Sequence, residues 1–206
     1  MAELPRLTVK WAQTLDGRAA AADGSSQWIT GPAARADVHS RRAAADAILV
    51  GTGTLLADDP SLTARTPEGE LLVPAAEQPV PIVVGSREAP AGARVLGHPA
   101  LGGRFPAPLR LAGRDLAAEL ATLPALGIQS VFVEGGPAIV SSLLRAGLVD
   151  ELLVYIAPAL LGGPRLAVGE LGIASMAGIH RLEFTRTEHL GPDLLIIASP
   201  AKKETS

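Results

Sequence analysis

The sequence contains no cysteine and very few aromatic residues, and each shortage excludes a kind of site. Without thiols the chain forms no disulfide and no thiolate zinc site, and the redox compartment stays open. Aromatic residues make up 3% of the 206 residues, so few rings are present on which nucleic-acid bases could stack. The net charge of −3 provides no overall positive field for nucleic acid either. An anionic ligand would therefore need a local cluster of arginines and backbone amides.

Long apolar runs are missing as well. No stretch approaches the ~20 apolar residues of a membrane-spanning helix, and residues 1–6 contain no apolar run of signal-peptide length. We therefore expect a cytoplasmic protein with no membrane partner and no nucleic-acid partner. The length suits a single α/β domain over residues 1–206, with its core at about 7–198 and a polar tail at 202–206.

Strand and helix patterns alternate along the chain, which is typical of an α/β fold. Apolar runs predict strands at 7–12, 47–50, 80–85, 130–133, 152–156, 181–185 and 194–198. Prolines suited to a first helical turn predict helices from Pro32 to about Ala45 and from Pro137 to Gly147, and a third helix is expected over 115–122. The sheet should be mainly parallel, with the last two strands adding an antiparallel edge. Segments 66–79 and 97–108 are expected to be loops.

Two glycine-containing turns directly follow buried strands. Gly51-Thr52-Gly53-Thr54 follows the strand at 47–50, and Glu134-Gly135-Gly136-Pro137 follows the strand at 130–133. Glycines there let the backbone approach a ligand, and the amides that follow can bind a phosphate. A purely structural tight turn is an alternative for the first, because Leu56 occupies the third glycine position of the dinucleotide fingerprint. If the two strands are neighbours, both turns face one crevice, which favours a nucleotide cofactor; no Walker-type lysine follows either turn.

Several charged residues are candidates for ligand contacts. Glu134 ends a buried strand, where its carboxylate either pairs with donors of a ligand or accepts bonds from the free amides of the next helix. Arg41, Arg42 and Arg65 are candidate phosphate clamps, because the planar guanidinium matches phosphate oxygens, although most arginines on a helix face are only solvated. Trp28 either stacks on a ligand ring or fills the core.

The histidines and serines do not suggest a metal site or a hydrolase. The four histidines, at positions 39, 98, 180 and 189, show no i, i+4 pairing and are expected at the surface or in loops. We predict no metal site. No G-x-S-x-G motif is present, which weakens a hydrolase interpretation.

Taken together, four segments resemble the reductase domain of the bifunctional deaminase–reductase of riboflavin biosynthesis. They are residues 10–17, 27–32, 46–65 and 133–157, and the most specific are Trp28-Ile29-Thr30 and Leu56-Ala57-Asp58-Asp59-Pro60. The resemblance implies a dihydrofolate-reductase-like three-layer α/β fold, with a central mostly parallel mixed sheet and helices on both faces. It also implies a homodimer, to which residues 152–161 could contribute an interface strand, although they could equally be ordinary core.

The same resemblance implies NADPH as hydride donor and a phosphorylated pyrimidine as substrate. The substrate is 5-amino-6-(5-phosphoribosylamino)uracil, whose ribose is reduced to ribityl. Implied cofactor contacts are Ala12, Trp28, Thr54, Asp58, Ser86, Gly135, Gly136, Pro137 and Ala138. Implied substrate contacts are Ser26, Arg42, Leu62, Arg65 and Glu134. Lys10 and Glu134 are the candidate catalytic residues, as proton donors for sugar opening, and Arg87 is a candidate partner for the 2′-phosphate of NADPH.

Two features depart from the bifunctional pattern. The zinc deaminase domain of that pattern uses histidine and paired cysteines, whereas this sequence starts at the first reductase strand and has no cysteine. The sequence is therefore either a stand-alone reductase, with a separate deaminase as a candidate partner, or a domain excised from a longer protein. Segment 97–108 is rich in proline and glycine where the family has a strand. Two alternatives remain: a reductase of the same fold acting on a pterin or another heterocycle, and a non-catalytic nucleotide-binding module. Arg42 and Arg65 favour the phosphorylated substrate, and Glu134 argues against the module.

Overall fold

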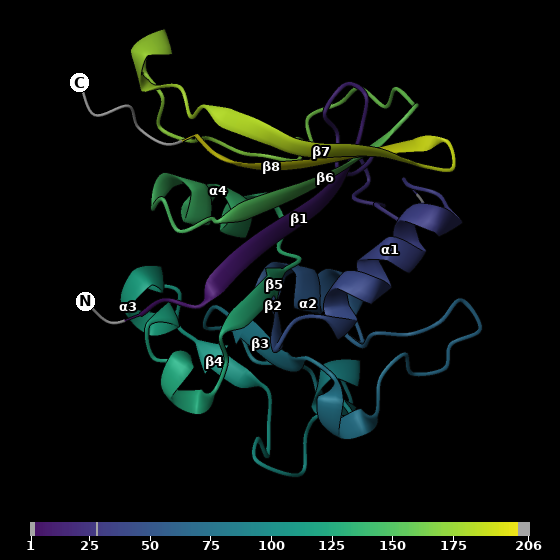
Figure 1. Cartoon of the computed structure of the whole chain (residues 1–206), viewed down its shortest axis with the longest axis vertical. Helices are drawn as coiled ribbons and strands as arrows, with labels where there is room; N and C mark the ends of the chain where they lie inside the picture. The colour runs from purple at the N-terminus through teal and green to yellow at the C-terminus, as the bar shows by residue number, and fades with distance from the viewer. Residues whose placement is uncertain (1–2, 28, 202–206) are drawn as a thin grey trace.

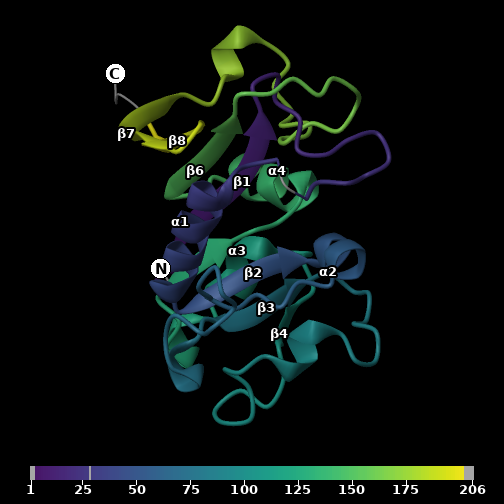
Figure 2. The same ribbon diagram turned by 90° about the vertical axis from the view of Figure 1, so that its right-hand side faces the viewer.

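The computed structural model describes residues 3–27 and 29–201, which build one mixed sheet with helices on both faces (Figures 1 and 2). Its eight strands are β1 (Arg6–Thr14), β2 (Ala47–Gly51), β3 (Val80–Val84), β4 (Leu109–Leu111), β5 (Ser130–Val133), β6 (Glu151–Ala157), β7 (Leu182–Leu190) and β8 (Asp193–Pro200). Their order across the sheet is β4-β3-β2-β5-β1-β6-β8-β7. Strands β1 to β6 pair in parallel, whereas β8 is antiparallel to both β6 and β7. The predicted mostly parallel sheet with an antiparallel edge is confirmed.

Four α-helices connect these strands, and two of them begin at the predicted prolines. They are α1 (Pro32–Ala43), α2 (Thr52–Asp58), α3 (Leu116–Leu120) and α4 (Pro137–Arg145). Short 3₁₀ helices cover Ala75–Glu77, Arg94–Gly97, Pro124–Leu126 and Met176–Gly178. Helix α2 differs from the expected tight turn, because the chain becomes helical directly after the extended residue Gly51. The expected helix over 115–122 is shorter, and the strand β4 follows rather than occupies the loop at 97–108.

The core lies on both faces of the sheet. On one face α3 and α4 pack over Leu49 and its neighbours, and on the other α1 and α2 pack over Ile48 and Val50 (Figure 1). Successive residues of β2 thus point to opposite faces, and because both faces are covered the whole strand is buried. This explains why β2 appears in the sequence as a continuous apolar run.

Two long connections cross the carboxyl ends of the central strands. Residues 15–31 join β1 to α1, and residues 158–181 join β6 to β7. The Asp16 carboxylate accepts hydrogen bonds from the amides of Leu161 (3.1 Å) and Gly162 (2.7 Å), and the two connections also share a backbone bridge. The two loops are therefore fastened to each other above the strand ends.

Strand β6 lies inside the sheet, between β1 and β8, so its hydrogen-bonding edges are both used. Leu152, Leu153 and Tyr155 are buried in the core. Of the two interpretations of residues 152–161, the structure supports ordinary core for β6. No helix in the described ranges is both long and apolar enough to span a membrane.

Candidate active site

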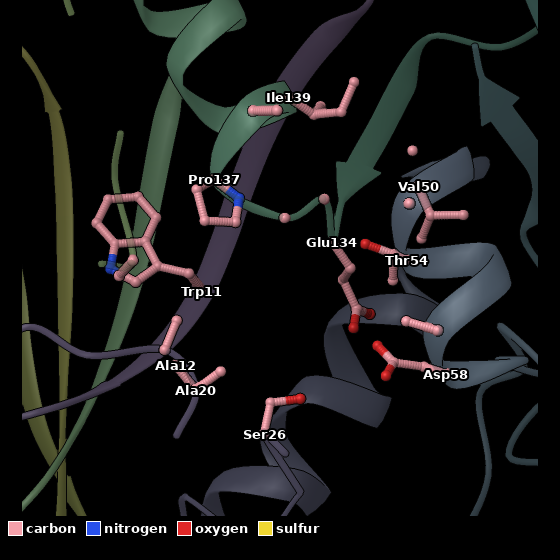
Figure 3. Close-up of a pocket in the computed structure, with 18 of the residues that line it drawn as sticks. Trp11, Ala12, Ala20, Ser26, Val50, Thr54, Asp58, Glu134, Pro137 and Ile139 are labelled. Carbon is pink, nitrogen blue, oxygen red and sulfur yellow. The ribbon is translucent and has the colours of Figure 1, made fainter. Parts of the chain in front are cut away.

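A cavity of about 820 Å³ opens where the central parallel strands end (Figure 3). Gly51, Gly53 and Thr54 line it from the β2–α2 turn, and Gly135 and Gly136 line it from the β5–α4 turn. Strands β2 and β5 are direct parallel neighbours. Both glycine turns therefore face one crevice, as the sequence predicts, and this is the usual position of ligands in open α/β sheets.

Close packing inside the chain explains two of these glycines. A Cβ atom placed on Gly51 would lie 2.9 Å from a side-chain carbon of Ile139, and one on Gly135 would lie 2.7 Å from the Ile139 Cβ. Neither contact is tolerable, so both glycines are needed for α4 to approach β2 and β5. Because both glycines also line the cavity, this packing is a further reason for them beside the predicted approach of a ligand.

The starts of α2 and α4 are available to an anion. Their N-cap residues, Gly51 and Gly136, provide no side-chain hydrogen bond to the first turn. The first amides of a helix have no partner inside the helix, and they carry the positive end of its dipole. The hydroxyl of Thr54 and the pyrrolidine ring of Pro137 stand at the same cavity wall (Figure 3).

A buried ionic cluster lines the same cavity, next to the β5–α4 turn. Arg42 of α1 donates to both carboxylate oxygens of Glu134, over 2.6 and 2.9 Å, and the Lys10 Nζ lies 3.9 Å from Glu134 Oε2. The three side chains are only 12–19% exposed. The Glu134 carboxylate thus pairs with two cations of the chain itself rather than with amides of the next helix, which corrects that alternative. Glu134 also lines the cavity.

Burial and pairing set the protonation of this cluster. Burial opposes ionisation of Glu134, but Arg42 and then Lys10 outweigh it and hold the carboxyl pKa at about 2. Burial lowers the pKa of Lys10, Glu134 partly offsets this effect, and Arg42 adds to it. With all three groups charged the cluster carries one net positive charge, and Lys10 is the member whose proton is made easier to lose.

The three arginines predicted as phosphate clamps differ in their surroundings. Only Arg42 lines the cavity, and beyond Glu134 its Nη1 donates to the Thr63 carbonyl over 3.0 Å. Arg41 pairs with Asp37 at 3.4 Å and lies outside the lining. Arg65 also lies outside it and donates to the Ser61 hydroxyl over 2.7 Å.

Most of the other predicted contacts are brought together at the cavity. The lining includes Lys10, Ala12, Ser26, Leu62, Asp58, Glu134, Pro137 and Ala138. Leu62 is at the cavity wall, although the residue as a whole is only 1% exposed. Burial raises the pKa of Asp58, whose carboxylate points into the cavity (Figure 3).

One predicted cofactor contact is not at the cavity wall, and the position of another is not described. Ser86 lies on an exposed turn after β3 and is not among the lining residues. Trp28 lies outside the described residues. Arg87, next to Ser86, reaches the edge of the site, since a Cβ on Gly53 would lie 3.6 Å from its Nη2.

Sequence reasoning missed one aromatic residue and one loop of the cavity. Trp11 lines it, with its indole nitrogen donating to Gln13 over 2.7 Å (Figure 3). The segment 164–169 contributes a further wall. The position of Trp11 between Lys10 and Ala12 on one strand was the available signal. No signal in the sequence predicts the wall at 164–169, because this wall depends on hydrogen bonds between two loops that are distant in the chain.

The four histidines differ in their surroundings: His98 lies in the predicted loop at 97–108, and His39 lies on α1. His98 is buried at 3% exposure and His39 is partly buried, whereas His180 and His189 are exposed as expected. Within the described ranges no three His, Asp or Glu side chains gather as a metal site would require.

Comparison with known proteins finds a matching family and similar sequences over nearly the whole chain. Residues 5–196 match the family model described as the RibD C-terminal domain. The riboflavin biosynthesis protein RibD of Mycobacterium tuberculosis is 48% identical over 194 residues, covering 94% of this chain and 54% of that protein. The chain thus spans about half the length of this relative.

Two further similarities cover nearly the whole chain. The 2,5-diamino-6-ribosylamino-4(3H)-pyrimidinone 5′-phosphate reductase of Methanothermobacter thermautotrophicus is 38% identical over 213 residues, covering 93% of this chain and 96% of that protein. A structure of Acinetobacter baumannii RibD superposes with a TM-score of 0.83 at 29% identity, over 97% of this chain and 59% of that one.

Proposed function

The chain belongs to the RibD C-terminal domain family, and we propose that it is a reductase of riboflavin biosynthesis that acts on 5-amino-6-(5-phosphoribosylamino)uracil. Its fold is the dihydrofolate-reductase-like fold of the RibD reductase domains. The observation that carries the proposal is one cavity that joins two glycine turns to the cluster of Lys10, Arg42 and Glu134. The turns suit a nucleotide, and the cluster suits a polar, anionic substrate beside it.

The cavity has the features that a dinucleotide needs. It has about 820 Å³ of space and two helix starts without side-chain caps. Gly135, Gly136, Pro137 and Ala138 would hold the diphosphate with Thr54, while Ala12 and Trp11 would lie near the nicotinamide. Such a cofactor supplies a hydride, and the protein supplies position and protons.

The ionic cluster has a role at the sugar in this proposal. In the ring-opened substrate, the C1′ carbon is double-bonded to nitrogen, and its reduction takes one hydride at carbon and one proton at nitrogen. Lys10 is the proposed proton donor, because its lowered pKa makes the ammonium a better acid. Glu134 keeps Lys10 and Arg42 in place, and Ser26 with the 59–65 segment would bind the sugar phosphate.

Preference for NADPH over NADH is proposed from Arg87. Its guanidinium lies at the edge of the β2–α2 turn, and its carbonyl accepts a 2.7 Å bond from Arg110 Nη2. Two guanidinium groups beside the adenosine end suit a 2′-phosphate. Arg87→Ala should raise the KM for NADPH and leave the KM for NADH unchanged; equal effects on both would exclude Arg87.

A homodimer is proposed from the outer antiparallel edge. Phe184 and Leu182 of β7 are 71% and 41% exposed, and nearby Met176 is 76% exposed. Apolar side chains gathered on one edge often mark a contact between subunits. We further propose a cytoplasmic location, where reduced nicotinamide is available, and a separate deaminase that supplies the substrate.

The direct test is oxidation of NADPH by the purified chain with the phosphorylated substrate and with its dephosphorylated analogue. The proposal expects turnover with both and a higher kcat/KM with the phosphate present. Binding of NADPH without turnover of either compound would favour a binding module. Turnover of a pterin in preference to both would favour the alternative substrate.

A further inference from the structure

Residues 62–65 begin at the cavity wall, and their peptide groups are bonded to side chains from three other parts of the chain. His98 Nε2 lies 3.3 Å from the Leu62 carbonyl, and Gln78 bonds both the amide (2.8 Å) and the carbonyl (3.1 Å) of Ala64. From α1, Arg42 donates to the Thr63 carbonyl at 3.0 Å and His39 accepts from the Arg65 amide at 3.1 Å. Backbone groups of a loop usually turn to water or to local turns. Here, distant side chains hold three consecutive peptide groups.

The same segment contains unusual backbone geometry. Asp59 (φ 40°) and Leu62 (φ 55°) are the only non-glycine residues with positive φ in the described part of the chain. This left-handed conformation is unfavourable for a residue with a Cβ atom, and it persists only where the surroundings determine it. The Leu62 side chain, at 1% exposure, is anchored in the core beneath α1.

The protonation of His98 follows from its two contacts. The Ala100 amide donates to His98 Nδ1 at 3.2 Å, so Nδ1 carries no proton. The Nε2 atom therefore carries it and donates to the Leu62 carbonyl. His98 and Gln78 are each 3% exposed, and neither lines the cavity. A buried polar side chain is costly unless it is bonded, and both side chains find partners in segment 62–65. Gln78 also donates to the Val73 carbonyl at 3.0 Å.

We propose that Gln78 and His98 are positioning residues that hold segment 62–65 in its strained conformation for the sugar phosphate of the substrate. They act through Leu62, which belongs to the cavity lining, and through Arg65, whose guanidinium is bonded to Ser61. The inference rests on the proposed reductase function. It adds that recognition of the phosphate depends on two residues from segments 66–79 and 97–108, which touch no ligand themselves.

The test compares His98→Leu and Gln78→Met with the wild type, using NADPH and the substrate with and without its phosphate. His98→Leu removes the donor to Leu62, and Gln78→Met removes the bonds to Ala64 at similar size. Each should lower kcat/KM for the phosphorylated substrate about tenfold, mostly through KM, and should leave the KM for NADPH within about twofold. The dephosphorylated analogue should lose much less, so the preference for the phosphate should fall.

Two comparison variants separate positioning from general destabilisation. His98→Gln keeps a donor that can reach the Leu62 carbonyl and should recover most of the preference. Asp46→Ala removes three bonds to Gln129 and Ser130 at the amino ends of the strands, far from the cavity, and should leave the preference unchanged. Hydrogen exchange of a peptide covering 61–66 should accelerate in His98→Leu and Gln78→Met but not in Asp46→Ala.

The outcomes distinguish the inference from the function on which it rests. An inactive wild type would overturn both. An active wild type with an unchanged phosphate preference in Gln78→Met and His98→Leu would overturn the inference alone, as would a His98→Gln variant that behaves like His98→Leu. If His98→Leu does not fold, Gln78→Met decides by the same criteria.

Discussion

The two sides of the cavity obtain their shapes in different ways. The turns at Gly51 and Gly135 are shaped by neighbours in sequence and by one packing contact, with Ile139. The segment 59–65 is shaped by side chains up to 36 residues away, among them Gln78 and His98. A local turn can be predicted from its glycines, whereas a segment held by distant side chains cannot. The ionic cluster of Lys10, Arg42 and Glu134 lies between the glycine turns and segment 59–65, and its geometry depends on both.

The largest expected effect is at that cluster. Glu134→Gln leaves Arg42 and Lys10 buried without their counter-charge, which should lower the free energy of unfolding by about 3–5 kcal/mol. The control is Glu151→Gln, because Glu151 pairs with Arg6, whose side chain is 62% exposed. That change should cost less than about 1 kcal/mol. Urea unfolding measures both, and equal losses would contradict the account of the cluster.

The cluster should also make the stability of the protein depend on pH. The pKa of Glu134 is held at about 2, below the ordinary glutamate pKa of 4.5 that applies in the unfolded chain. Its contribution to stability is therefore fully present above pH 4.5 and is lost as the pH falls toward 2. Glu134→Gln should flatten the acid side of the stability curve, and a curve unchanged in shape would argue against the pairing.

The next effect concerns the glycine turns. Gly135→Ala places a Cβ 2.7 Å from Ile139 Cβ and should cost about 1–3 kcal/mol of stability through overpacking. Gly103→Ala is a matched control, since a Cβ there meets nothing within 4 Å. In an Ile139→Ala background the cost of Gly135→Ala should shrink. Additive costs in the double variant would show that the clash is not the reason for the glycine.

Mild acid should lower the free energy of unfolding through His98 and His39, which hold segment 62–65. Burial lowers the pKa of His98 and of His39 below 6.5, and nearby Arg42 lowers both further. The unfolded state thus takes up protons first, so the free energy of unfolding should fall as the pH drops below 6.5 and level off once the folded state is protonated. His98→Gln should reduce this fall. Exposed His189→Gln should not, and a reduction of equal size there would contradict the assignment.

The smallest effect is expected at the fastening of the two loops. Hydrogen bonds from Thr14, Gly162 and Leu161 hold the pKa of Asp16 at about 2. Asp16→Asn should loosen the wall at 164–169 and raise the KM for both cofactor and substrate a few-fold, with kcat little changed. Asp115→Asn is the control, because Asp115 bonds to the Ala118 amide at the start of α3 and lies outside the cavity lining. Steady-state kinetics of both variants provide the comparison, and matching changes would exclude a special role for Asp16.

The sequence predicts those parts of the molecule whose signals are local. The apolar run at β2, the prolines at the starts of α1 and α4 and the late antiparallel pair are all of this kind. The convergence of the two glycine turns follows once β2 and β5 are neighbours. The Arg42–Glu134 pair joins residues 92 positions apart, and the burial of His98 depends on a loop with no regular pattern. Such tertiary contacts leave no periodic trace in one sequence.

The measurement that tests the central claim most directly follows a labelled hydride. NADPH carrying deuterium at the transferred C4 position would be oxidised by the wild-type chain with the phosphoribosylaminouracil, and the product would be analysed by mass spectrometry and NMR. We expect one deuterium at C1′ of the ribityl group for each cofactor oxidised. Product without deuterium at C1′, or cofactor oxidation that proceeds without substrate, would contradict the claim that one cavity brings nicotinamide and sugar together.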